Sequence, residues 1–133
     1  MATEAPAALD PMLVQSFVAN AHGNLDAVRN ALADEPALAN AAWDWGGGDW
    51  ETALGAAGHM GRPDIAAVLI AHGARIDVFV AAMLGDVEIV RAIVEAHPGT
   101  REAKGPHGIP LRAYAEAGGE PARAVLELLD AES

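Results

Sequence analysis

Side chains suited to ligand binding are concentrated in two short glycine-rich stretches of the chain. Residues 43–50 contain all three tryptophans together with Asp44 and Asp49, and residues 104–108 contain His107. Tryptophan offers a large apolar surface with one N–H donor, and glycine allows a backbone to approach a ligand closely. We therefore expect both stretches to be recognition loops.

Histidine supplies the most versatile chemistry, because its imidazole changes charge near neutral pH. His59 stands in the sequence Gly58–His59–Met60–Gly61, at the expected end of a helix. With Asp49 and His107 it is a candidate acid–base or ligand-binding group. The remaining histidines stand at turns near expected helix ends, where a role in capping or with the helix dipole is expected: His22, His72 and His97.

Known metal and catalytic motifs are missing from the sequence. There is no cysteine, no HExxH or CxxC spacing, no GxSxG and no phosphate-binding loop, so neither a metal site nor a cofactor is predicted. Glu51 and Thr52 place an acid beside a hydroxyl, but Thr52 has an ordinary expected role as a helix N-cap.

The charge of the chain limits its partners. Eight basic residues stand against 19 acidic ones, for a net charge of −11 and a pI near 4.6. Such a chain repels phosphate backbones and anionic lipid surfaces, so neither nucleic acid nor a membrane is expected as a partner. The first ten residues lack a basic leader, and no window is apolar enough to span a bilayer, so we expect a cytoplasmic protein.

The composition predicts an all-α fold of short helices. Of 133 residues, 31 are alanine and only six are aromatic, while 14 glycines and 8 prolines punctuate the chain. Alanine favours helices and allows them to pack closely. The length is that of a single domain, expected to cover residues 1–133.

An internal repeat indicates how these helices are arranged. Residues 17–36 align without a gap with residues 79–98, at an offset of 62, or two units of about 31 residues. The identical pairs are Phe17/Phe79, Val18/Val80, Ala19/Ala81, Gly23/Gly85, Val28/Val90, Arg29/Arg91 and Pro36/Pro98. A repeat of this length indicates helical units that stack on one another.

The segment between these two copies, residues 51–77, resembles the ankyrin repeat. The positions that match its pattern are Thr52, Leu54, Ala56, Ala57, Gly61, Asp64, Ile65, Leu69, Gly73 and Ala74. The segment departs from the pattern at Ala53, where proline is usual, and at Gly55, where histidine is usual. Residues 109–129 supply a further unit, with a second helix expected from Pro121 to Leu129.

The resemblance covers about 115 residues and implies a solenoid of helix–turn–helix units with projecting finger loops. The expected units are 10–40, 41–75, 76–100 and 101–133. The turn glycines Gly23, Gly61, Gly85 and Gly118 are separated by 38, 24 and 33 residues. The short middle interval predicts that the third unit lacks its finger, which leaves a notch between the other two fingers.

The resemblance implies a non-catalytic module that binds a protein partner on its concave and finger face. The net charge favours a basic partner segment. The expected binding residues are Trp43, Asp44, Trp45, Asp49, Trp50, His59, His107 and Tyr114. The ring of Tyr114 is expected to pack in the core, and we expect Trp50 to pack as well, because it adjoins the helix start at Thr52.

Two alternatives remain open from the sequence. The notch could hold a small molecule or an active site, with Asp49, His59 and His107 as polar groups on an apolar wall of Trp45, Trp50 and Phe79. The irregular units could instead form a homodimer interface in which Trp43 and Trp45 are buried against a second copy.

Overall fold

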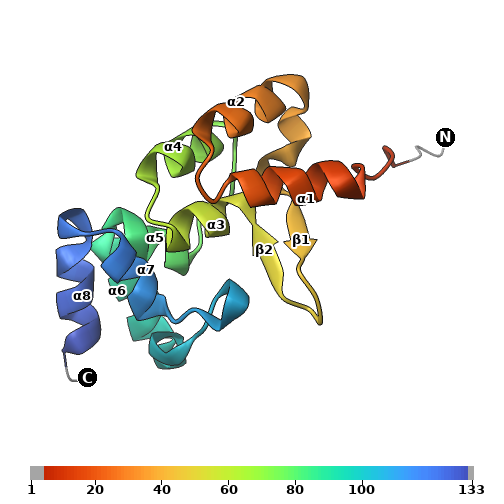
Figure 1. Cartoon of the computed structure of the whole chain (residues 1–133). Coiled ribbons are helices and arrows are strands. Elements are labelled where there is room, and N and C mark those ends of the chain that lie inside the picture. The colour runs from red at the N-terminus through yellow and green to blue at the C-terminus, as the bar shows by residue number, and fades with distance from the viewer. Residues whose placement is uncertain (1–4, 132–133) are drawn as a thin grey trace.

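A computed structural model describes residues 5–131, and helices predominate in it (Figure 1). Residues 1–4 and 132–133, which belong to the expected domain, lie outside this range. The helices are α1 (Pro11–Asn20), α2 (Leu25–Asp34), α3 (Ala53–His59), α4 (Pro63–Ala71), α5 (Val78–Leu84), α6 (Val87–Ala96), α7 (Leu111–Ala117) and α8 (Arg123–Asp130). Within residues 5–131, none of the helices has the length and apolar character that crossing a bilayer requires.

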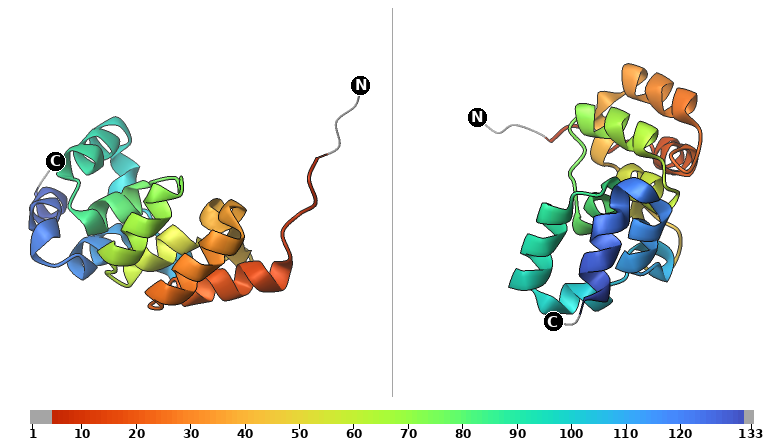
Figure 2. Two further views of the ribbon diagram at one scale, coloured as in Figure 1. Left: turned by 90° about the horizontal axis from the view of Figure 1, so that it is seen from above. Right: turned by 90° about the vertical axis from the view of Figure 1, so that its left-hand side faces the viewer.

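The helices are arranged in successive pairs, each joined by a short turn. The first helices of the pairs pack side by side in the order α1, α3, α5, α7, while α2 packs on α4 and α6 packs on α8 (Figures 1 and 2). Each of the four expected units, 10–40, 41–75, 76–100 and 101–133, contains one of these pairs.

Local capping signals explain where several helices begin. The side chains of Asp10, Asn24 and Thr52 each accept a hydrogen bond of 3.0 Å from a backbone N–H in the first turn of the helix that follows. Pro63 occupies the first position of α4, where a missing N–H costs nothing. The role of Thr52 as a helix N-cap is the one expected from the sequence.

The last helix differs from expectation. It was expected to begin at Pro121, but Pro121 lies in a 3₁₀ turn, η4 (Glu120–Ala122), and α8 follows only from Arg123. A 3₁₀ turn is a common entry to an α-helix. The chain approaches it through Gly119, whose φ of 68° excludes a helical start at that residue.

The turn glycines allow neighbouring pairs to pack closely. Gly61 and Gly85 have φ values of 64° and 79°, which favour glycine. A Cβ atom on Gly61 would lie 2.4 Å from the carbonyl oxygen of Ala117, and one on Gly85 would lie 2.0 Å from that of Pro121. The backbone of the last pair therefore rests directly on these two turns.

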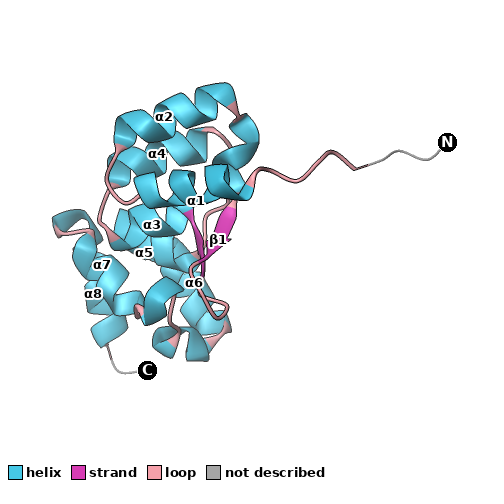
Figure 3. Ribbon diagram, turned by 45° about the vertical axis from the view of Figure 1, so that its right-hand side comes forward, coloured by secondary structure: helices cyan, strands magenta, loops and turns pink. Residues whose placement is uncertain are grey.

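Two finger segments project from the helices. Between α2 and α3 lie the 3₁₀ helix η1 (Pro36–Asn40) and a hairpin of β1 (Ala42–Asp44) and β2 (Trp50–Thr52), the two-stranded sheet of the described residues (Figure 3). Its antiparallel register pairs Trp43 with Glu51. We call residues 42–52 the hairpin finger.

The second finger lies between α6 and α7. It contains the 3₁₀ helices η2 (Pro98–Glu102) and η3 (Pro106–Gly108), and an isolated bridge pairs Lys104 with Pro110. We call residues 104–110 the second finger.

Between α4 and α5 the chain has only residues 72–77, as expected from the short glycine spacing. The Asn40 side chain holds this connection by donating to the carbonyl of Gly73 at 3.0 Å and accepting from the N–H of Arg75 at 2.8 Å. The third pair thus has no finger of its own. The hairpin finger and the second finger flank the position where that finger would be.

One hydrophobic core runs through all the pairs. Its larger buried side chains include Phe17, Leu32, Leu54, Ile65, Leu69, Val80, Val90, Leu111, Tyr114 and Val125. Buried alanines such as Ala56, Ala57, Ala81 and Ala82 allow the first helices to approach one another. The finger segments connect these packed pairs along the chain.

Candidate functional site

A single buried carboxylate, that of Glu51, lies at the base of the hairpin finger. Among residues 5–131, Glu51 is the one charged residue that is buried. Side chains alternate along a strand, so Glu51 points inward while its neighbour Trp50 points to the opposite face. The indole Nε1 of Trp45 donates to Oε1 of Glu51 at 2.9 Å. Burying a carboxylate is costly, so the groups around it must compensate.

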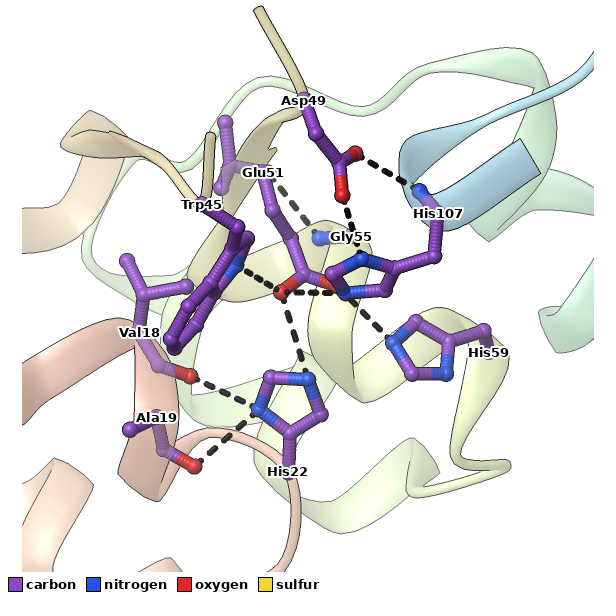
Figure 4. A network of polar contacts seen from close by, with 10 residues as sticks. Val18, Ala19, His22, Trp45, Asp49, Glu51, Gly55, His59 and His107 are labelled. Carbon is purple, nitrogen blue, oxygen red and sulfur yellow. Dashed lines mark hydrogen bonds and ion pairs between the residues drawn. The ribbon is translucent and has the colours of Figure 1, made fainter. Parts of the chain in front are cut away.

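Three histidines surround this carboxylate, and each faces it with Nε2 (Figure 4). His22 and His107 lie 3.2 Å and 3.3 Å from Oε1, and His59 lies 2.8 Å from Oε2. The ring centroids are 5.1 Å apart for His22 and His59, 5.6 Å for His59 and His107, and 6.4 Å for His22 and His107. One potential ligand atom from each of these four residues lies within 4.8 Å of the others.

His22 is held by the end of α1. Its Nδ1 lies 3.0 Å from the carbonyl oxygen of Val18 and 3.1 Å from that of Ala19. A carbonyl oxygen only accepts hydrogen bonds, so Nδ1 carries the proton. The expected helix-end role of His22 is therefore present at one ring nitrogen, while the other faces Glu51.

His107 is held by the hairpin finger. Its Nδ1 lies 2.7 Å from Oδ2 of Asp49, and its backbone N–H donates to Oδ1 of the same carboxylate at 2.7 Å. His107 has a φ of 62°, a conformation that no other non-glycine residue between 5 and 131 adopts. Such a conformation costs on the order of 1 kcal/mol, and the contacts to Asp49 help to hold it.

His59 reaches the site because α3 begins directly after β2. Thr52 caps that helix, so Glu51 lies just before its first turn and His59 lies at its end. The side chain of His59 is 11% exposed, against 27% for His22 and 33% for His107. The site is thus closed on the side of Glu51 and His59 and open on the side of His22 and His107.

The pKa values reflect these contacts. Burial would raise the pKa of Glu51, but the hydrogen bonds from His59 and Trp45 and the proximity of His22 and His107 hold it below its usual value. The backbone N–H of His107 lowers the pKa of Asp49. Burial would lower the pKa of His107, but Asp49 and Glu51 together raise it.

The proton positions create an electrostatic conflict at Nε2. When His22 and His107 are neutral with the proton on Nδ1, each presents an Nε2 lone pair to Oε1 of Glu51, which also has only lone pairs. Two acceptors at 3.2–3.3 Å repel one another unless a cation lies between or beside them. Either protons or a metal ion would satisfy this arrangement.

The donor set and its outer contacts fit a transition-metal ion. Imidazole nitrogens suit Zn²⁺, Cu²⁺, Fe²⁺ and Ni²⁺, and a carboxylate oxygen completes a four-ligand set. Histidine ligands usually donate their second N–H to a carbonyl or a carboxylate. His22 does so to Val18 and Ala19, and His107 does so to Asp49.

The structure brings together part of the residue set expected from the sequence. Asp49, His59 and His107 converge, as the small-molecule alternative predicted, and Trp45 lies beside them with its ring centroid 6.2 Å from that of His107. Tyr114 is fully buried, as expected, and packs edge-on against His59 at a centroid distance of 6.2 Å.

The other expected residues lie elsewhere. Trp50 is 61% exposed, so the expectation that it packs is wrong, because β2 turns Glu51 and not Trp50 inward. With Trp43 and Asp44 it lines a shallow hollow of about 270 Å³ next to α1. The ring of Phe79 packs against that of Tyr114 at an interplanar angle of 51°, with the centroids 5.0 Å apart. The expected wall of Trp45, Trp50 and Phe79 is therefore reduced to Trp45 at this site.

Sequence reasoning missed two of the central residues, Glu51 and His22. A signal for His22 was present in the sequence. His22 stands directly before the turn glycine Gly23, and His59 stands two residues before the turn glycine Gly61. The two histidines therefore lie at nearly equivalent positions of successive repeat units. For Glu51 the signal was its place directly before the capping residue Thr52, which fixes the orientation of the strand.

Comparison with known proteins adds no further information. The chain matches no protein-family model, no curated protein and no solved structure at a significant level. Function is therefore argued from the geometry of the site.

Proposed function

We propose that this chain binds one divalent first-row transition-metal ion through Nε2 of His22, His59 and His107 and the carboxylate of Glu51. One observation carries the proposal: three Nε2 atoms face one fully buried carboxylate, with the four ligand atoms within 4.8 Å of each other. An ion there removes the lone-pair conflict that the neutral histidines create.

Protonation is the competing way to satisfy the same contacts. It would require imidazolium forms of both His22 and His107, beside the carboxylates of Glu51 and Asp49. Asp49 and Glu51 raise the pKa of His107 and so favour its imidazolium form. Protonating His22 as well would place two positively charged rings with their centroids 6.4 Å apart. A metal ion needs no such protons, and it binds deprotonated imidazole.

Metal loading of the purified chain tests the proposal. We expect protein stripped with a chelator and reloaded with Zn²⁺ to retain one ion per chain, while excess Mg²⁺ or Ca²⁺ does not displace it, because these ions prefer oxygen ligands. Glu51→Gln should lose most of the affinity. Glu88→Gln is the matched control, since the Glu88 side chain is 82% exposed on α6. Retention of less than a stoichiometric amount of Zn²⁺ by the native chain would contradict the proposal.

For the scaffold, we infer that the four helix pairs form a solenoid of the ankyrin type. The sequence resemblance supports this, as do the ordered packing of α1, α3, α5 and α7 and the two projecting fingers. On this scaffold the ion joins three units, because its ligands come from the turn after α1, from β2 and α3, and from the second finger. The ion would therefore link the hairpin finger, through Glu51, to the second finger, through His107.

A second candidate function is protein binding on the outer face of the hairpin finger. It is favoured by the exposed indole of Trp50 and by the hollow that Trp50 shares with Leu9, Val14 and Trp43. The net charge of −11 favours a basic partner segment. If this is correct, capture of a partner weakens with added salt and is lost in Trp50→Ala, while light scattering shows the chain as a monomer. A dimer lost in Trp50→Ala would instead indicate that the partner is a second copy.

A further inference from the structure

Polar contacts of one residue hold the second finger in place. Among residues 5–131, every hydrogen bond or ion pair that joins residues 104–110 to the hairpin finger or to a more distant part of the chain is made by His107. Its partners are Asp49 and Glu51 (Figure 4). The other hydrogen bonds of the finger, including the bridge at its base, are internal or run to the adjoining start of α7. The position of the second finger therefore depends on His107.

Two features disfavour this closed position of the finger. His107 has a φ of 62°, which is unfavourable for a residue with a side chain. The buried hydroxyl of Tyr114 lies directly beneath the finger, since a Cβ atom on Gly105 would be only 2.5 Å from its oxygen. That hydroxyl has no hydrogen-bond partner among residues 5–131, and such a group is stabilised when water reaches it. Movement of the finger away from Tyr114 relieves both costs.

A metal ion in the proposed site opposes this movement. Glu51, His22 and His59 lie outside the second finger, so His107 is the one ligand that the finger supplies. It is also the most exposed of the three histidines, at 33% of its side chain. An ion bound by all four ligands requires the closed position, whereas the open position leaves it three. By linkage, the ion therefore favours the closed finger by the ratio of its affinities for the two positions.

We propose that the metal ion controls the position of the second finger: the bound ion holds residues 104–110 closed over Tyr114, and loss of the ion releases His107 and opens the finger. This inference rests on the metal binding proposed above and adds what the ion regulates. Because the protein itself supplies all four ligands, the ion is a structural part of the closed form. The chain then responds to metal supply through the position of one surface loop.

Hydrogen exchange of the His107 backbone amide, followed by NMR, measures the opening directly, because its acceptor Asp49 lies outside the finger. The amide of Val90, which donates to the carbonyl of Asp86 in α6, is the internal control. Zn²⁺ should slow exchange of the His107 amide at least about tenfold relative to chelator-treated protein, and slow that of Val90 far less.

The same comparison separates the two proposals. Equal slowing at His107 and Val90 would show that the ion stabilises the whole fold, and would overturn control of the finger. Unchanged exchange at His107 in protein that retains one Zn²⁺ per chain would also overturn it, while metal binding stands. Protein that retains no Zn²⁺ would overturn both proposals.

Proteolysis gives a second readout, because Lys104 at the base of the finger is the only lysine of the chain. A lysine-specific serine protease cleaves after Lys104 when the finger opens. Zn²⁺ should slow this cleavage in the native chain but not in His107→Ala, whose finger carries no ligand. His22→Ala is the matched ligand variant: at saturating Zn²⁺ it should stay protected, because the ion still joins Glu51 and His59 to His107. Equal protection of His107→Ala would overturn the proposal.

The contribution of the Tyr114 hydroxyl is tested in the metal-free protein. Tyr114→Phe removes the unpaired group from beneath the finger, so the His107 amide should exchange several-fold more slowly than in the native chain, with the Val90 amide as reference. Unchanged or faster exchange at His107 would show that opening does not expose Tyr114 to water, and would overturn that part of the proposal.

Discussion

Asp49 and His107 lie 58 positions apart in the sequence, yet one carboxylate oxygen of Asp49 accepts the His107 backbone N–H at 2.7 Å and the other lies 2.7 Å from its Nδ1. This double contact joins the hairpin finger to the second finger across the gap left by the short connection 72–77. It also turns Nε2 of His107 toward Glu51. The absence of a third finger therefore allows the site to form.

Asp49 should orient the ring of His107 for metal binding without binding the ion itself. Asp49→Asn keeps an oxygen for the His107 backbone N–H but replaces the second oxygen with an N–H₂ group, which cannot accept from Nδ1. We expect Zn²⁺ affinity to fall by about 10–100-fold, as is usual for such outer contacts. Competition with a chelating indicator measures it. Asp44→Asn is the control, because Asp44 accepts from the N–H groups of Gly46 and Gly48 in the same hairpin. Equal losses in the two variants would show a general hairpin effect.

The stability of the metal-free protein should depend on pH through His107. Asp49 and Glu51 raise its pKa in the folded state, so its stabilising contribution is complete below the unfolded value of 6.5 and is lost as pH rises through the folded value. The difference in unfolding free energy between the native chain and His107→Ala, measured with urea in the presence of a chelator, should decline over this interval. A difference that grows with pH would contradict the assignment.

The unfolding free energy of the metal-free native chain at acidic pH should depend on the ionisation of Glu51 and Asp49. Their folded pKa values are lowered, so their contributions are complete above the unfolded values of 4.5 and 3.8 and are lost as pH falls through the folded values. Metal affinity should follow a different course and weaken steadily with acid, because protons compete with the ion for the histidines.

The hydroxyl of Tyr114 should contribute little to stability. Its oxygen is buried and has no hydrogen-bond partner among residues 5–131. Burial raises the pKa of Tyr114, so the hydroxyl stays protonated. We expect Tyr114→Phe to leave the unfolding free energy within about 0.5 kcal/mol of the native value or to increase it, since an unpaired buried hydroxyl is itself costly. Tyr114→Ala should lose about 3–5 kcal/mol through the cavity it creates. A loss above about 1.5 kcal/mol in Tyr114→Phe would show that an ordered water binds the hydroxyl.

The contribution to stability of the close contact between Gly85 and the last helix pair can be measured separately from that of backbone strain. Gly85 and Gly73 both have positive φ, at 79° and 91°, so alanine is strained at either position. A Cβ atom at Gly85 would also lie 2.0 Å from the carbonyl oxygen of Pro121, whereas Gly73 faces open space. We expect Gly85→Ala to cost about 1–3 kcal/mol more than Gly73→Ala in urea unfolding. Equal costs would mean that the last pair does not rest on this turn.

Much of the helical framework could be predicted from the sequence. Asp10, Asn24, Thr52 and Pro63 are local signals, and each marks a helix start without help from distant residues. The convergence of Asp49, His59 and His107 was also predictable, because the repeat spacing showed that one finger was missing between the two that carry Asp49 and His107.

The centre of the site was harder to predict, for physical reasons. Glu51 is a charged residue that the fold buries, against the usual preference, and only its position in a three-residue strand determines that it points inward. His22 has an ordinary helix-end contact through Nδ1, and this contact hides the role of Nε2. Trp50 was expected inside because it adjoins the helix start at Thr52, but the alternation of the strand places it outside.

Calorimetric titration of Zn²⁺ into the native chain, His22→Ala and His72→Ala tests the central claim most directly. His72 is the matched control, because it has the same kind of helix-end contact as His22 but is not among the four clustered ligands. Nδ1 of His72 lies 2.8 Å from the carbonyl oxygen of Val68, and Nδ1 of His22 lies 3.0 Å from that of Val18. The account predicts one ion per chain, an affinity at least about tenfold weaker in His22→Ala, and native affinity in His72→Ala. Native affinity in both variants, or the same loss in both, would contradict a metal centre built on His22, Glu51, His59 and His107.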